Sequence, residues 1–202
     1  MDDLLIRQEQ LQHEAHEVMT ELALPTVLGR VGRVEVIGSA ASGLMVWRDL
    51  DISVYTDASA ADRVAAVVRD LVANPAVLDL HYANETGARS PSGGVHDQRY
   101  YAVVRYRSRR GERWKIDLSL WTDTGPRGEF SAAHRLRDRL TDDTRIAILR
   151  IKDIWHQHQD YPDKIGGIDI YDAVLNHGVR TADEFGTYLD AHRQTDRPTP
   201  TP

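Results

Sequence analysis

A short stretch near the N-terminus, residues 36–54, constrains the fold more than any other part of the sequence. An apolar run ends in Gly38-Ser39, a loop follows, and Asp49 and Asp51 then enter a second apolar run. Side chains two residues apart on an extended strand project from the same face, so we expect the two carboxylates to lie side by side. Carboxylates that close repel each other unless a cation neutralises them. The stretch therefore predicts two strands, joined by a loop, that hold a cation.

The residue types in this stretch favour a magnesium ion and a phosphate. Mg²⁺ is usually held by one or two carboxylates together with substrate phosphates, which fits the paired aspartates. Gly38 lets the backbone approach a phosphate closely, and Ser39 offers a hydroxyl. The pattern indicates a site for a metal and a nucleotide phosphate. The alternative is an Asx-type turn that leads into a half-buried strand.

A third carboxylate, Asp117, lies in a later segment that alternates as a strand. It stands among apolar residues in the segment 113–121. An unpaired carboxylate buried in such a strand would cost more free energy than a hydrogen bond returns. Asp117 therefore needs a partner, either a basic residue such as the adjacent Arg105 or a metal ion shared with Asp49 and Asp51.

Gly38-Ser39, a gap of nine residues and then Asp49-Leu50-Asp51-Ile52 resemble the signature of the DNA polymerase β-like nucleotidyltransferase superfamily. The resemblance implies an α+β fold, with a mixed β-sheet nucleotidyltransferase domain, flanking helices and a small C-terminal helical domain. It further implies that Asp117 completes a catalytic and metal-binding triad with Asp49 and Asp51. The expected cofactors are Mg²⁺, as two ions, and a nucleoside triphosphate as co-substrate.

The resemblance also extends to nucleotide-binding residues. It implies that Gly38 and Ser39 hold the β- and γ-phosphates. Lys152, on a predicted helix, resembles the helix-borne lysine that reaches the triphosphate in several nucleotidyltransferases, and Tyr171 resembles an aromatic residue near the nucleotide. Ile170 stands where many relatives have serine. A surface lysine and a core tyrosine are the alternatives for these two positions.

The periodicity of apolar residues predicts the remaining elements. We expect a catalytic domain over 1–128, a helical domain over 129–194 and a disordered tail over 195–202. The predicted helices cover 2–23, 58–73, 131–159, 170–176 and 181–193. The predicted strands cover 31–37, 50–55, 77–83, 99–107 and 113–121.

Composition excludes several other classes of protein. The chain has 202 residues and no cysteine, so disulfide frameworks, thiolate metal sites and cysteine nucleophiles are excluded. No apolar run approaches the length that spans a bilayer, and the acidic N-terminus does not resemble a signal peptide. We therefore expect a cytoplasmic protein without a membrane partner.

The acceptor of the nucleotidyl group is open at this point. The net charge of −6 favours a small, cationic molecule, as for the antibiotic nucleotidyltransferases that the chain resembles. Arginine-rich segments, which include 105–113 and 135–150, favour tRNA, as for the nucleotidyltransferase toxins, and an antitoxin-like protein partner would then be expected. A catalytically silent nucleotide-binding module is the third alternative.

Overall fold

The computed structural model describes residues 2–91, 97–122, 129–162 and 164–195. Contacts divide the chain into a sheet unit, Glu9–Asp138, and a helical unit, Met1–Gln8 with Arg139–Pro202. The predicted domain boundary between 128 and 129 stays a prediction. The tail predicted from 195 lies, apart from Thr195, outside the described residues.

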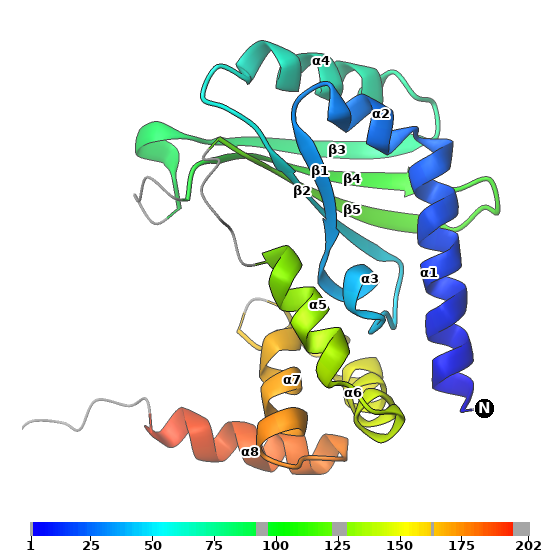
Figure 1. Ribbon diagram of the computed structural model, residues 1–202, viewed down its shortest axis with the longest axis vertical. Helices are drawn as coiled ribbons and strands as arrows, with labels where there is room; N and C mark the ends of the chain where they lie inside the picture. Colours follow the sequence, from blue (N-terminus) through cyan, green and yellow to red (C-terminus); the bar gives the residue numbers. More distant parts are fainter. Residues whose placement is uncertain (1, 92–96, 123–128, 163, 196–202) are drawn as a thin grey trace, which may run out of the picture. The chain divides into compact units, whose positions relative to one another are not determined.

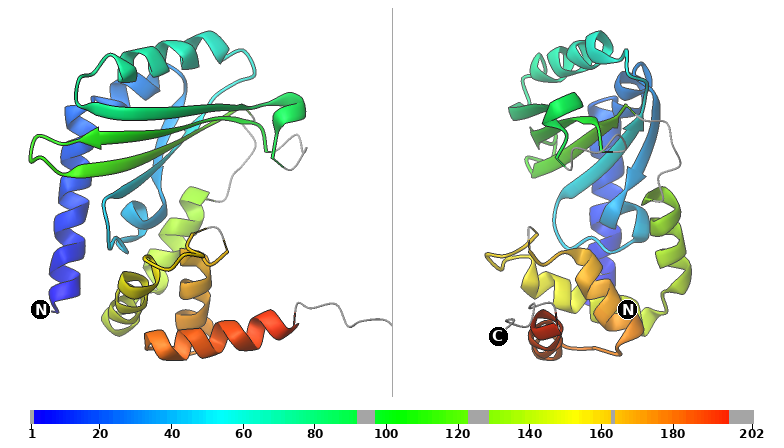
Figure 2. Two further views of the ribbon diagram at one scale, coloured as in Figure 1. Left: turned by 180° about the vertical axis from the view of Figure 1, so that it is seen from behind. Right: turned by 90° about the vertical axis from the view of Figure 1, so that its left-hand side faces the viewer.

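A five-stranded mixed sheet forms the centre of the sheet unit. Its strands are β1 (Arg33–Ile37), β2 (Asp49–Tyr55), β3 (Val77–Glu85), β4 (Arg99–Arg107) and β5 (Arg113–Trp121). They lie in the order β1-β2-β5-β4-β3, and β2 runs parallel to β5 while the other pairs are antiparallel. Figure 1 shows β3, β4 and β5 side by side, and the left view of Figure 2 shows the β4–β5 hairpin from behind. The predicted α+β fold is confirmed.

One face of this sheet carries the hydrophobic core. The helices of the unit are most of α1 (Asp3–Glu21), α2 (Leu24–Gly29), α3 (Gly38–Ser42), α4 (Ala61–Val72), the 3₁₀ turn η1 (Gly87–Arg89) and α5 (Glu129–Arg139) up to Asp138. Apolar residues of α1, α2 and α4 are buried against alternate residues of β2, β4 and β5. The intervening residues of β2 and β5, among them Asp49, Asp51 and Asp117, therefore project from the opposite face.

The N-terminal helix ends earlier than the sequence pattern predicts. We expected one helix over 2–23, and α1 ends at Glu21. A second helix, α2, begins at Leu24, with Pro25 in its first turn. Proline has no backbone N–H to donate, so it is tolerated at a helix start, where that group has no helical partner. Pro25 therefore marks the beginning of a further helix as well as the end of the first.

The helical unit contains α6 (Asp142–Trp155), α7 (Gly167–Asn176) and α8 (Ala182–Thr195). The prediction of one helix over 131–159 is wrong, because α5 ends at Arg139 and α6 starts at Asp142. Thr141 caps α6: its hydroxyl accepts a hydrogen bond from the Thr144 backbone N–H. In the described parts of the chain, no helix is long and apolar enough to cross a membrane.

Candidate active site

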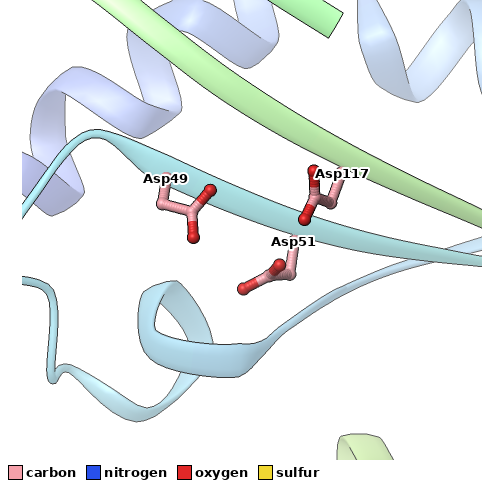
Figure 3. Close-up of side chains that lie close together, drawn as sticks. All are labelled: Asp49, Asp51 and Asp117. Atoms are coloured by element: carbon pink, nitrogen blue, oxygen red, sulfur yellow. The ribbon is translucent and has the colours of Figure 1, made fainter. Parts of the chain in front are cut away.

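The three aspartates meet on neighbouring strands of the sheet unit. Asp49 and Asp51 lie on β2, and Asp51 pairs in register with Asp117 on the parallel strand β5. One carboxylate oxygen from each lies within 4.8 Å of the others. Figure 3 shows the three side chains gathered beside α3. The structure thus brings together the predicted triad, and its role as metal ligand and catalytic centre stays a prediction.

The surroundings of Asp117 fit a divalent cation. Its Oδ1 atom is buried and accepts no hydrogen bond from any residue that the structure describes. Buried polar atoms nearly always have a partner, and an ion is one of the ordinary explanations when the protein supplies none. Three clustered carboxylates form the hard, oxygen-only ligand set that Mg²⁺ prefers. The residues present therefore fit the magnesium ion that the sequence predicts.

Gly38 is required by the close approach of the α3 start to β2. Its φ angle is +63°, in the left-handed region that disfavours residues with a Cβ. A Cβ atom at this position would lie 2.3 Å from Asp51 Oδ2, which is far too close. The Ser42 hydroxyl donates to the Gly38 carbonyl at 3.0 Å and helps to fix this turn. The predicted phosphate residues Gly38 and Ser39 thus adjoin the triad.

Lys115 contacts the triad, although the site predicted from the sequence does not include it. Its Nζ donates to Asp117 Oδ2 at 2.7 Å and to Asp49 Oδ1 at 3.2 Å. Burial alone would lower the pKa of Lys115, but the two carboxylates outweigh burial and raise it above the ordinary value. Lys115 is therefore a stable ammonium ion between two members of the triad.

The basic partner suggested for Asp117, Arg105, is wrong. Arg105 contacts Asp79 of β3, with 3.5 Å between Nε and Oδ1. Lys115 is the basic residue that contacts Asp117, and it precedes Asp117 by two positions. Residues two apart share a face of a strand, so this spacing was the signal in the sequence that identifies Lys115.

Two aromatic side chains, those of Tyr101 and Trp121, lie beyond Asp117 on the same face of the sheet. The Arg99 guanidinium lies 4.5 Å from the centre of the Tyr101 ring and 5.0 Å from that of Trp121. Arg99 also donates to Glu85 at 2.6 Å and to Ser119 at 3.1 Å. Burial and the negative charge of Asp117 raise the pKa of Tyr101 to about 12. Tyr101 therefore keeps its proton to higher pH than an ordinary tyrosine does.

The two remaining predicted nucleotide residues contact each other in the helical unit. Lys152 of α6 is buried, and its Nζ lies 3.5 Å from the hydroxyl oxygen of Tyr171 on α7. A Cβ atom at Gly167 would lie 2.9 Å from that same oxygen, so glycine makes room for the tyrosine. The predicted role of both residues at the nucleotide stays a prediction.

Comparison with known proteins shows a similarity of fold. No family model and no curated protein matches the sequence. A cytoplasmic RNA terminal U-transferase of known structure superposes with a TM-score of 0.51 and 14% identity, over 86% of this chain and 51% of that one. The Cid1 poly(U) polymerase, solved with Mg and 3′-dATP, gives a TM-score of 0.47 and 16% identity, over 70% and 40% of the two chains. The chain therefore shares its fold with part of the RNA terminal U-transferase. It spans about half the length, or less, of these solved structures.

Proposed function

We propose that this chain is a magnesium-dependent nucleotidyltransferase, which moves a nucleoside monophosphate from a nucleoside triphosphate to an acceptor hydroxyl. The observation that carries the proposal is the meeting of Asp49, Asp51 and Asp117 within 4.8 Å on this fold. Mg²⁺ bound to such carboxylates stabilises the attacking and leaving oxygens of an in-line displacement at phosphorus. A partner module that binds neither metal nor nucleotide would need no such concentration of negative charge.

Each group of predicted residues has a distinct task in this proposal. Asp49, Asp51 and Asp117 would hold two magnesium ions, which would supply Lewis-acid stabilisation of the displacement, and Asp117 would receive the proton of the acceptor hydroxyl. Gly38 and Ser39 contact the β- and γ-phosphates through the backbone and the serine hydroxyl. Lys152 adds positive charge toward the triphosphate, and Tyr171 lies at the nucleotide.

We further propose a small, cationic molecule as the acceptor. The net charge of −6 disfavours a polyanion. Several basic side chains of the segment 105–115 are already neutralised by acidic ones. Arg110 contacts Glu17 at 2.7 Å, and Arg105 and Lys115 pair with the aspartates named above. Three of the six basic side chains in this segment are thus paired with acidic ones, which supports the small molecule.

RNA, such as tRNA, is the second candidate acceptor, and its support comes from the name of a protein of similar fold. The solved protein with the TM-score of 0.51 is described as an RNA terminal U-transferase. If RNA is the acceptor, transfer should weaken steeply with salt, because each phosphate contact releases bound counterions. An antitoxin-like protein partner also stays a prediction.

The experiment that tests the proposal supplies both acceptors. The full chain is incubated with Mg²⁺, each α-³²P-labelled nucleoside triphosphate and either total tRNA or a metabolite extract. Label in a small product supports the proposal, and label that co-migrates with RNA contradicts the acceptor but keeps the reaction. Absence of transfer to either pool, together with absence of triphosphate binding, would refute the reaction itself.

A further inference from the structure

We propose that the Lys115 ammonium group is an internal counter-ion of the triad, which a divalent cation displaces when it binds. The inference rests on the proposed function, because it takes Asp49, Asp51 and Asp117 as the metal site. It assigns to Lys115 a task that none of the three aspartates has. Lys115 holds the carboxylates together before the metal arrives and sets how tightly the metal binds.

The contacts of Lys115 place its charge where a metal ion would lie. Its Nζ bonds one oxygen of Asp49 and one of Asp117, from two different strands. Mg²⁺ bonds carboxylate oxygens at about 2.0–2.1 Å, so an ion on these same two oxygens would touch Nζ. Two cations in contact repel each other strongly, and the triad cannot hold both in this arrangement.

The side chain of Lys115 can leave this place without disturbing the sheet. Its backbone lies within β5, between β2 and β4, and its N–H donates to the Arg48 carbonyl at 3.1 Å. The side chain itself is 35% exposed, so water is available to its ammonium group. A lysine has a flexible four-carbon stem, which lets the charged end swing away while the strand stays in register.

The balance of charge favours displacement of the Lys115 ammonium group by the metal ion. Three carboxylates and one ammonium leave the triad with an excess of negative charge. A divalent cation neutralises that excess better than one ammonium can. Lys115 should therefore yield to the metal, and its removal should make the metal bind more tightly.

An internal counter-ion and a lysine that only supports the fold differ in how their loss depends on the metal. Without metal, Lys115→Met should lower the melting temperature, because the carboxylates of Asp49 and Asp117 then lack their shared cation. With metal, that loss should disappear, since the ion takes over the contacts. A purely structural lysine would cost the same stability in both states.

The test uses the full chain, Mn²⁺ as the probe and no nucleotide. Mn²⁺ binding is measured by isothermal titration calorimetry, and thermal unfolding is measured in EDTA and in saturating Mn²⁺. We expect Lys115→Met to bind Mn²⁺ at least about tenfold more tightly than the wild type. The melting temperature of Lys115→Met should also rise more than that of the wild type when EDTA is replaced by saturating Mn²⁺. The matched control is Arg105→Met, which removes a positive charge opposite Lys115 in the register of β4 and β5. It should bind Mn²⁺ as the wild type does.

Equal or weaker Mn²⁺ binding by Lys115→Met would overturn the inference and leave the proposed metal site intact. Absence of Mn²⁺ binding by both proteins would overturn the metal site and the inference together. A Lys115→Met protein that folds only with Mn²⁺ supports the inference. If it folds under neither condition, Lys115→Gln, which keeps hydrogen-bonding capacity without the charge, decides by the same titration: tighter binding supports the inference, and unchanged binding overturns it.

Discussion

Replacement of Gly38 by alanine tests how closely the α3 turn approaches the triad. The new Cβ would lie 2.3 Å from Asp51 Oδ2 and 3.1 Å from Asp51 Cγ. The left-handed backbone costs an alanine about 1–2 kcal/mol. The movement of atoms that removes the clash costs a further ~1–3 kcal/mol of stability, the usual range for an overpacked site. Gly38→Ala should therefore lose about 2–5 kcal/mol of stability, and the carboxylate of Asp51 must move.

The control for this change is Gly87→Ala in the same unit. Gly87 has a φ angle of +60°, and a Cβ there would meet no atom within 4 Å. Gly87→Ala should lose only about 1–2 kcal/mol of stability, which is the cost of placing an alanine on a left-handed backbone. Urea unfolding compares the stabilities, and nucleotidyl transfer should fall about 100-fold in Gly38→Ala alone, as expected for a group misplaced by about 1 Å. Equal loss of stability in both variants, with full transfer by Gly38→Ala, would refute the reasoning.

Three further predictions concern other parts of the molecule. Burial and the Glu21 carboxylate raise the pKa of Tyr106 to about 12, so stability that is complete below about pH 10 should fall as the pH rises toward 12. Tyr106→Phe should remove part of that fall in alkaline unfolding; an unchanged slope would contradict it. Thr141→Ala deletes the cap of α6 and should cost about 1 kcal/mol in urea unfolding, whereas no loss would show that the cap is unimportant. Lys152→Met should weaken triphosphate binding about tenfold in a fluorescence titration and leave Mn²⁺ binding unchanged; equal triphosphate affinity would exclude a phosphate contact.

The strands and the common face of Asp49 and Asp51 could be predicted because those signals are local, whereas the place of Asp117 in the triad was implied by the family resemblance. The spacing of Asp49 and Asp51 fixes their common face, and the alternation around Asp117 gives its strand almost residue by residue. The shared contact of Lys115 with two strands was not predictable in this way. It depends on the parallel register that sets Asp49 opposite Lys115, and 66 positions separate these residues in the sequence.

The boundaries of two helices also cannot be predicted from apolar periodicity alone. Apolar periodicity continues through residues 131–159, so the pattern alone predicts one helix. The break at Thr141 is decided by a side-chain hydrogen bond to the Thr144 N–H, which competes with helical continuation. The pattern predicts a helix end at Pro25 but not the helix that begins there, because proline is common both after a helix end and at a helix start.

The most direct test of the central claim measures metal-dependent binding of a nucleoside triphosphate. The full chain and the double variant Asp49→Asn with Asp51→Asn are titrated with each labelled triphosphate, in Mg²⁺ and in EDTA. Replacement by asparagine keeps the shape of both side chains and removes their charges. Binding that requires Mg²⁺ and is lost in the double variant is the predicted result. Binding that is equal with and without Mg²⁺, or equal in both proteins, would contradict the assignment of the triad.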